Sequence, residues 1–177
     1  AVGPRFTQVT HKSHKQSDEK KQIGKINAIS GAALLLKTDA FDKINGFDEK
    51  IFLFFEENDL CARLTKQNFN IYQLNKIKVF HPKGVEKGTV EVDNNKYSTL
   101  QNFYGWHYMW SKFYHYKKNK FYFFSYIFFI PTILRFILRI IFHGVIQDHN
   151  NKNKYLMRLN GLLSSMTNIP SNKRINL

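Results

Sequence analysis

The sequence predicts an α/β fold in its first half, followed by a helical, basic and aromatic-rich tail. Three observations support this prediction: the order of apolar segments between residues 26 and 80, an uneven distribution of charge, and one long apolar segment at 121–143. Helical segments that lie between strands are typical of an α/β layer rather than of a helical bundle.

The first half contains several short segments with distinct patterns. Small and apolar residues at 28–36 indicate a buried strand. Thr38 is a suitable N-cap for a short helix over 39–44, and Asn45-Gly46 is a strong stop signal for it. A longer helix over 56–67 and two short strands over 70–74 and 77–80 follow. Residues 11–25 and 83–96 are polar and are predicted to be loops.

The predicted helix over 56–67 has a clear internal pattern. Leu60 and Leu64 fall on one face and form its buried stripe. Asp59 and Arg63 are spaced as an i,i+4 ion pair, and acidic residues gather in the first turn, where they oppose the helix dipole.

The charge divides the chain into two regions with different tasks. Residues 1–93 hold 15 Lys and Arg against 12 Asp and Glu, a net charge of +3, whereas residues 94–177 hold 12 against one, a net charge of +11. Nine aromatic residues precede residue 94 and 19 follow it. This distribution suggests a polyanionic partner for the tail, either nucleic acid or an anionic membrane surface.

The single cysteine excludes a disulfide framework and any zinc site built from several cysteines. It suits a reducing, cytoplasmic setting. The first residues, AVGPRF, have the pattern of the later part of a strand, so we expect the chain to be part of a longer protein.

The tail is predicted to form a helix over 97–120, an apolar helix at 121–143 and a short helix over 160–168, with Pro131 kinking or dividing the second. Only 14 residues precede Arg135 in the apolar segment, which is too short to span a bilayer. Arg139 would also lie inside the membrane at a high energetic cost. Five polar side chains form one narrow stripe: Ser125, Thr132, Arg135, Arg139 and His143. An in-plane interfacial helix is therefore favoured, with Arg135, Arg139, Lys117 and Lys118 as the membrane-contacting cations.

Two alternatives for the tail compete with a membrane face. The first is a core helix whose polar stripe faces water. The second is nucleic-acid binding, which is disfavoured because the aromatic residues form continuous apolar runs instead of alternating with cations.

The acidic cluster at 54–60, FFEENDL, is the candidate for chemistry. Glu56, Glu57 and Asp59 lie at a helix start beside phenylalanines. Acids at a helix N-terminus are ordinary dipole partners. A carboxylate aimed into a cleft beside water-excluding rings can instead deprotonate a hydroxyl.

Several ordered motifs over residues 30–84 resemble the acceptor-side half of family-2 glycosyltransferases, especially rhamnosyltransferase-like bacterial enzymes that build surface polysaccharides. The motifs read Ser30-Gly31-Ala32, Ala40-Phe41, Asn45-Gly46-Phe47-Asp48-Glu49, Phe55-Glu56-Glu57-Asn58-Asp59-Leu60-Cys61-Ala62-Arg63 and His81-Pro82-Lys83-Gly84. The resemblance implies that residues 1–96 are the C-terminal part of a GT-A, Rossmann-like domain, and that residues 97–177 are a membrane-associating tail.

The resemblance also implies roles for individual residues in an inverting sugar transfer. Glu57 corresponds to the general base, with Glu56 beside it as a second catalytic carboxylate. Asp59, Asp48 and Gly31 correspond to acceptor-binding positions. His81 occupies the position that approaches the donor diphosphate or its metal.

The expected partners are a nucleotide-sugar donor, a glycan or lipid-linked acceptor and an anionic membrane, with no nucleic acid. A divalent metal, Mg²⁺ or Mn²⁺, is expected, although the Asp-x-Asp motif that holds it in the family is absent from this sequence. An upstream half, which would complete the fold, or a homo-oligomer is expected as a further partner. The expected location is the cytoplasmic face of a bacterial membrane. The alternative is a non-catalytic membrane-surface or interaction module left by truncation of such an enzyme.

Overall fold

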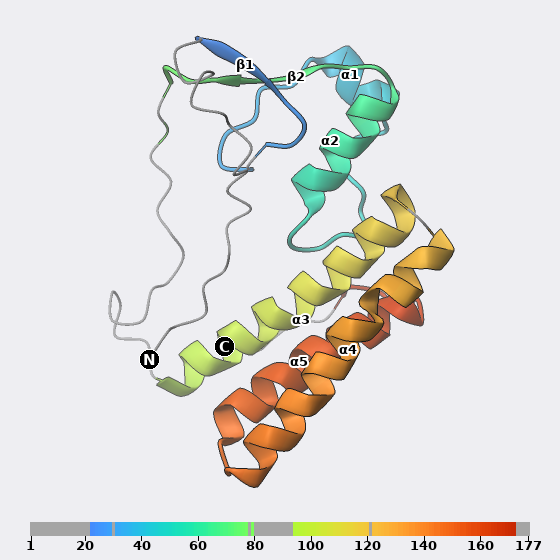
Figure 1. The fold of residues 1–177 in the computed structure, drawn as a ribbon. Helices are drawn as coiled ribbons and strands as arrows, with labels where there is room; N and C mark the ends of the chain where they lie inside the picture. The colour runs from blue at the N-terminus through green and yellow to red at the C-terminus, as the bar shows by residue number, and fades with distance from the viewer. Residues whose placement is uncertain (1–21, 30, 78, 80–93, 121, 173–177) are drawn as a thin grey trace.

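A computed structural model describes residues 22–29, 31–77, 79, 94–120 and 122–172. Two short strands and two short helices form one unit, and three long helices form a second (Figure 1). The described part is thus mostly helical, with one small sheet. A Rossmann-like parallel sheet is not present among the described residues, so that part of the fold class stays a prediction.

The sheet consists of β1 (Ile23–Ile26) and β2 (Ile71–Leu74), which pair antiparallel, with Ile23 opposite Leu74 and Ile26 opposite Ile71. β2 confirms the strand expected over 70–74. β1 was not expected, because its first three residues lie in the stretch 11–25 that was interpreted as a polar loop. It forms where a distant partner strand satisfies its backbone hydrogen bonds.

The strand expected over 28–36 is wrong for the described residues of that segment. No described residue there belongs to a strand, and the side chain of Leu35 is 97% exposed. A buried strand needs neighbouring strands, and the described part of the chain offers this segment none. Residues 77 and 79 also lie outside any strand, while 78 and 80 fall outside the described residues.

Two helices lie near the sheet, α1 (Thr38–Lys43) and α2 (Glu56–Lys66) (Figure 1). Both agree closely with expectation, although Thr38 begins α1 rather than capping it. The small core between them is formed by Ala40, Ile44, Leu60 and Leu64, which confirms the predicted leucine stripe. Arg63 reinforces this packing, because its Nη1 donates to the Ile44 carbonyl at 2.6 Å.

The second unit consists of α3 (Asn94–Asn119), α4 (Tyr122–Val145) and α5 (His149–Met166). α4 runs back along α3, and α5 returns beside both (Figure 1). Their core comprises Met109, Phe113, Phe129, Phe136 and Leu162. α5 is much longer than the predicted 160–168 helix. Its N-cap is Asp148, whose side chain accepts from the Asn151 amide at 3.0 Å.

α4 continues through Pro131 without dividing into two helices. The predicted division there is therefore wrong. Its buried residues are Ser125, Phe129, Phe136 and His143, so part of the predicted polar stripe faces the bundle. The alternative of a core helix is not supported, because most of the apolar residues of α4 are exposed; of the stripe, Ser125 and His143 are buried while Arg135 and Arg139 are exposed.

The two units contact one another along α3. Ser111 Oγ of α3 donates to the Leu53 carbonyl at 2.7 Å, and α2 packs against α3. The expected boundary between residues 96 and 97 falls within the first turn of α3 and stays a prediction.

Candidate functional site

The start of α2 has unusual backbone geometry. Phe54 and Phe55 have φ angles of 65° and 68°, in the left-handed region, and Phe55 caps the helix without a side-chain hydrogen bond. Bulky residues rarely adopt this conformation, and it persists only where surrounding packing enforces it. Such strain concentrates at functional sites. The strained turn leads directly into Glu56 and Glu57, the first two residues of α2.

Aromatic side chains of α3 enforce the strained turn. The Phe54 ring lies edge-on to Tyr104 and Tyr108, with centroids 5.9 and 5.8 Å away. The Phe55 ring lies 5.5 Å from Tyr108 and 5.6 Å from His115. The tail therefore supplies the wall that fixes the carboxylate-bearing turn of the first unit.

Glu57, the expected general base, reaches back to the segment before α1. Its Oε1 accepts a hydrogen bond from the Gly31 backbone amide at 3.3 Å. A Cβ at residue 31 would lie 3.5 Å from that oxygen, an ordinary van der Waals contact. The structure thus brings together Gly31 and Glu57, two residues that the sequence motifs singled out.

Glu56 lies in a different environment from its neighbour. Burial raises the pKa of its carboxyl, and the negative charge of Glu57 raises it further. Its Oε2 is buried and has no hydrogen-bond partner among the described residues. One of the two adjacent acids is therefore held by a backbone amide, while the other keeps a proton to higher pH than an exposed glutamate does.

Asp48 and Asp59, expected to bind acceptor, are joined by one lysine of α3. Lys118 Nζ lies 2.6 Å from Asp48 Oδ2 and 2.9 Å from Asp59 Oδ1. Asp59 is fully buried and also accepts from Arg63 Nε at 2.7 Å and Asn119 Nδ2 at 2.8 Å. The predicted pair of Asp59 and Arg63 is confirmed.

Burial opposes ionisation of both aspartates, but their hydrogen bonds outweigh it. The pKa of Asp59 is lowered by Asn119, Lys118 and Arg63, and that of Asp48 by Lys118 and other donors. Both carboxylates are thus charged and occupied by protein partners. Their acceptor-binding role stays a prediction.

The four expected membrane cations fall into two groups. Lys117 is buried, and its Nζ donates to Asn168 Oδ1 at 2.6 Å. Lys118 is held by the two aspartates, so both lysines face protein rather than open solvent. Arg135 and Arg139 are exposed on α4. Only the arginines have the exposure that a lipid contact requires.

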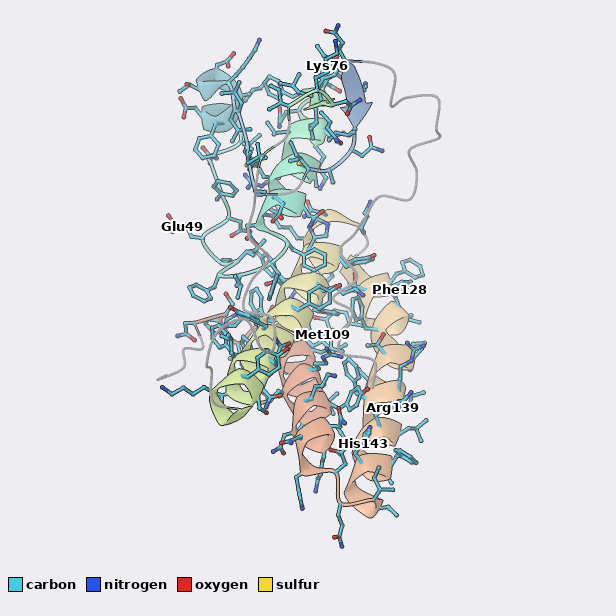
Figure 2. The ribbon with its side chains drawn as sticks, turned by 90° about the vertical axis from the view of Figure 1, so that its left-hand side faces the viewer. Glu49, Lys76, Met109, Phe128, Arg139 and His143 are labelled. Atoms are coloured by element: carbon cyan, nitrogen blue, oxygen red, sulfur yellow. The ribbon has the colours of Figure 1, made fainter. Side chains whose placement is uncertain are left out.

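The outer surface of α4 is strongly apolar, and Figure 2 shows its side chains projecting away from the other helices. The most exposed large residues there are Phe123 at 80%, Val145 at 78%, and Phe124 and Leu138 at 67%. By length and composition, α4 is the one helix in the described part of the chain that could cross a membrane. That criterion alone is weak evidence, since core helices and signal sequences also meet it.

The described residues contain no group of three or more His, Cys, Asp or Glu side chains that could hold a metal ion. His81, expected near the donor diphosphate, lies outside the described residues, as does the AVGPRF segment.

Sequence reasoning missed the parts of the site that come from α3. Tyr108, His115, Lys118 and Asn119 surround the start of α2, more than 40 residues away along the chain. The excess of cations and aromatic residues in the tail was the available signal, but it was interpreted as a membrane contact.

The first unit is similar to parts of known glycosyltransferases. Residues 11–85 match the family described as the N-terminal domain of galactosyltransferase. N-acetylglucosaminyl-diphospho-decaprenol L-rhamnosyltransferase from Mycobacterium tuberculosis, in the strains CDC 1551 / Oshkosh and ATCC 25618 / H37Rv, is 35% identical over 60 residues. That alignment covers 34% of this chain and 20% of each relative. No solved structure matches the chain.

The chain thus spans about a fifth of the length of the curated relatives that it matches. That the chain corresponds to the C-terminal portion of a rhamnosyltransferase-like enzyme stays a prediction. The two matches together support a glycosyltransferase family for this chain.

Proposed function

We propose that this chain forms the acceptor-side part of an inverting glycosyltransferase, which moves a sugar from a nucleotide-sugar donor to a hydroxyl of a lipid-linked or surface glycan. The observation that carries the proposal is the strained turn that presents Glu56 and Glu57. This turn lies inside the region that matches a galactosyltransferase domain. The relative named as an L-rhamnosyltransferase with a diphospho-decaprenol acceptor supports the same reaction class.

In the proposed reaction, Glu57 acts as the general base. Its carboxylate takes the proton of the acceptor hydroxyl while that oxygen forms a bond to the anomeric carbon of the donor sugar. The bond from that carbon to the diphosphate breaks, and its electron pair leaves with the nucleotide. Attack opposite the leaving group inverts the anomeric configuration. The Gly31 amide keeps the Glu57 side chain in one orientation, which favours proton transfer by position.

Glu56 has a supporting role in this proposal. Because the pKa of its carboxyl is raised, it is protonated over a wider pH range than an exposed glutamate would be, and it can then donate a hydrogen bond. Its buried Oε2 lacks a hydrogen-bond partner among the described residues, a need that an acceptor hydroxyl entering the site would meet. Two adjacent acids thus offer one acceptor and one donor to the same substrate.

The residues that bind the nucleotide are proposed to lie outside this chain, in an upstream segment or a second polypeptide. The expected Mg²⁺ or Mn²⁺ is proposed to be held by those same nucleotide-binding residues. The proposed roles of Gly31, Glu56 and Glu57 require no contact with that ion.

The test is sugar transfer by the full-length native protein that carries this chain. The probes are a nucleoside-diphosphate L-rhamnose as donor and an N-acetylglucosaminyl-diphospho-prenol as acceptor. Glu57→Gln is expected to slow turnover at least about 100-fold, the usual contribution of a general base. The matched control is Asp42→Asn, which neutralises an exposed acid on α1. Turnover of Glu57→Gln at the wild-type rate would exclude this role, and no transfer by the wild type would favour a non-catalytic module.

We also propose that α4 lies along the cytoplasmic surface of a bacterial membrane. Its exposed apolar side chains would cost free energy in water, at about 25 cal/mol per Å² of apolar surface. Arg135 and Arg139 stand on the exposed part of the same helix, where they can reach anionic headgroups. The net charge of +11 in residues 94–177 adds attraction to such a surface.

Vesicle flotation tests the membrane proposal. The full chain is mixed with vesicles of neutral lipid, or of neutral lipid containing anionic phospholipid. Ile127→Glu combined with Leu138→Glu should abolish flotation, because both side chains are more than 60% exposed on α4. Arg135→Glu combined with Arg139→Glu should weaken binding to anionic vesicles only. Flotation that neither double variant reduces would show that another surface binds lipid.

A further inference from the structure

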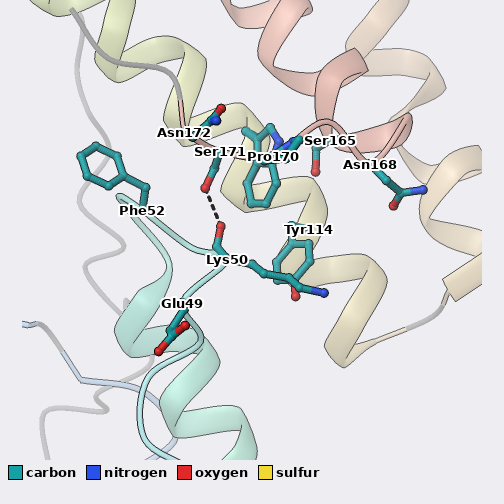
Figure 3. A pocket seen from close by; sticks show the side chains of 10 residues that line it. Glu49, Lys50, Phe52, Tyr114, Ser165, Asn168, Pro170, Ser171 and Asn172 are labelled. Carbon is teal, nitrogen blue, oxygen red and sulfur yellow. Dashed lines mark hydrogen bonds between the residues drawn. The ribbon is translucent and has the colours of Figure 1, made fainter.

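A cavity of about 460 Å³ lies where the loop before α2, the middle of α3 and the end of α5 meet (Figure 3). This volume is within the range of small-molecule sites. The residues that line it are Glu49, Lys50, Phe52, Trp110, Tyr114, Ser165, Asn168, Pro170, Ser171 and Asn172. None of them belongs to the Gly31, Glu56 and Glu57 group, so the cavity is a separate feature.

The cavity has a rigid aromatic wall. The rings of Trp110 and Tyr114 are stacked, with centroids 5.1 Å apart and an angle of 20° between planes. Trp110 Nε1 donates to the Ile169 carbonyl at 2.7 Å, and the Tyr114 hydroxyl donates to Asp48 Oδ2 at 2.9 Å. Because both polar edges are held, the rings have fixed positions before any ligand enters.

The mouth of the cavity is tied across its two sides. Ser171 Oγ donates to the Lys50 carbonyl, as the dashed line in Figure 3 shows. This bond joins the loop of the first unit to the segment after α5. The cavity therefore exists only because the two units are packed together.

The polar groups of the cavity have mixed character and little net charge. Glu49 and Lys50 carry opposite charges, and the amide side chains of Asn168 and Asn172 offer both donors and acceptors. Ser165 is 1% exposed, and its Oγ has no hydrogen-bond partner among the described residues. A buried hydroxyl without a partner is unfavourable, so a ligand hydroxyl at this point would satisfy an unmet hydrogen bond.

We propose that this cavity binds a sugar ring of the acceptor glycan, an inference that rests on the proposed glycosyltransferase function. A pyranose has an apolar C–H face that suits an aromatic wall, and it has hydroxyls that need both donors and acceptors. The partly exposed ring of Tyr114, stacked on the buried ring of Trp110, supplies the aromatic face, and the surrounding amides, hydroxyls and opposed pair of charges supply the donors and acceptors. A phosphate group would fit less well, because Glu49 shares the lining with Lys50.

Ligand-observed NMR on the full chain tests this inference. The probes are methyl N-acetyl-β-glucosaminide, methyl α-L-rhamnoside and, separately, inorganic phosphate. Saturation transfer to the C–H protons of at least one sugar is expected. Ser165→Ala should weaken its affinity about tenfold, as expected for the loss of one buried hydrogen bond. Ser164→Ala is the matched control, since Ser164 is also buried on α5 but does not line the cavity.

The remaining outcomes separate the two proposals. Asn172→Ala changes a rim residue and keeps the test valid if Ser165→Ala fails to fold. No binding of either sugar, equal binding by the cavity variants and the wild type, or binding of phosphate alone would overturn the sugar site. Sugar binding by a full-length protein that transfers no sugar would keep the site and refute the proposed function. Sugar transfer by a protein that shows no sugar binding at this cavity would support the proposed function and refute the sugar site.

Discussion

Replacement of Lys118 by methionine tests whether one cation of α3 joins the two units. The change keeps the apolar stem of the side chain and removes the ammonium group that lies 2.6 Å from Asp48 and 2.9 Å from Asp59. Asp59 has no exposed surface, so its charge cannot be recovered by water. The variant should therefore lose stability.

The size of the loss follows from the remaining partners. Breaking a fully buried ion pair costs about 3–5 kcal/mol, which sets the upper limit. Asp59 keeps Arg63 and Asn119, and the Lys118 side chain is 30% exposed, so solvent screening lowers the value. Hydrogen bonds to charged groups contribute about 1.5–3 kcal/mol each. We expect the free energy of unfolding to fall by about 2–3 kcal/mol at pH 7.

Urea unfolding of the full chain, followed by the fluorescence of Trp106 and Trp110, measures this loss. Lys76→Met is the matched control, because it removes the same charge from an exposed residue. The control should change stability by less than about 0.5 kcal/mol. An equal effect of the two variants would refute the assigned role of Lys118.

The same comparison has a defined pH dependence. The folded-state pKa values of Asp48 and Asp59 are lowered, so their contribution to stability is complete above the unfolded pKa of about 3.9. It disappears as pH falls through the lower folded values. The difference between wild type and Lys118→Met should therefore be constant from about pH 7 to 5 and shrink below about pH 4. A difference that persists undiminished at pH 2 would show that the ammonium group acts on something other than these carboxylates.

Further substitutions test the packing of the helices, each by urea unfolding of the full chain. Gly161→Ala should destabilise by about 1–3 kcal/mol or more, because its Cβ would overlap the Trp106 carbonyl oxygen. Gly144→Ala is its control and should stabilise by up to about 1 kcal/mol, since no atom lies within 4 Å of the added carbon. Phe113→Ala should cost about 3–5 kcal/mol, because the ring is fully buried in the helical core. Asp148→Ala removes the N-cap of α5 and should cost about 1 kcal/mol. Equal effects of the two glycine substitutions would refute the close approach of α5 to α3.

The local sequence pattern was sufficient to predict an element whose conformation depends mainly on its own residues. The predicted helix over 56–67 became α2 (Glu56–Lys66), because its leucine stripe, its acidic first turn and its ion pair all favour the same conformation. The strand at 70–74 was also predicted from its local pattern, although its partner strand was not. β1 and the segment at 28–36 were misjudged, since a strand depends on partners elsewhere in the chain.

The orientation of α4 could not be predicted from its composition. The period of its polar residues defines a stripe, but the stripe does not reveal whether it faces water or other helices. Ser125 and His143 are buried because α3 and α5 cover that side, and the phenylalanines and leucines opposite remain exposed. Only the packed bundle distinguishes these arrangements.

The contacts of α3 change how the acidic motif of the first unit is understood. The sequence motifs singled out four acids, and the structure separates them by their partners. Asp48 and Asp59 share an ion pair with Lys118, so their charges hold the loop and α2 against the tail. Glu56 and Glu57 have no cation within ion-pair distance among the described residues, and they stand on a turn held in a strained conformation by rings of the same helix α3. A carboxylate paired with lysine is a poor proton acceptor, whereas one without a cation can act as a base. The tail therefore holds Asp48 and Asp59 in structural contacts and leaves Glu56 and Glu57, the proposed catalytic pair, without a cation in the described part of the chain.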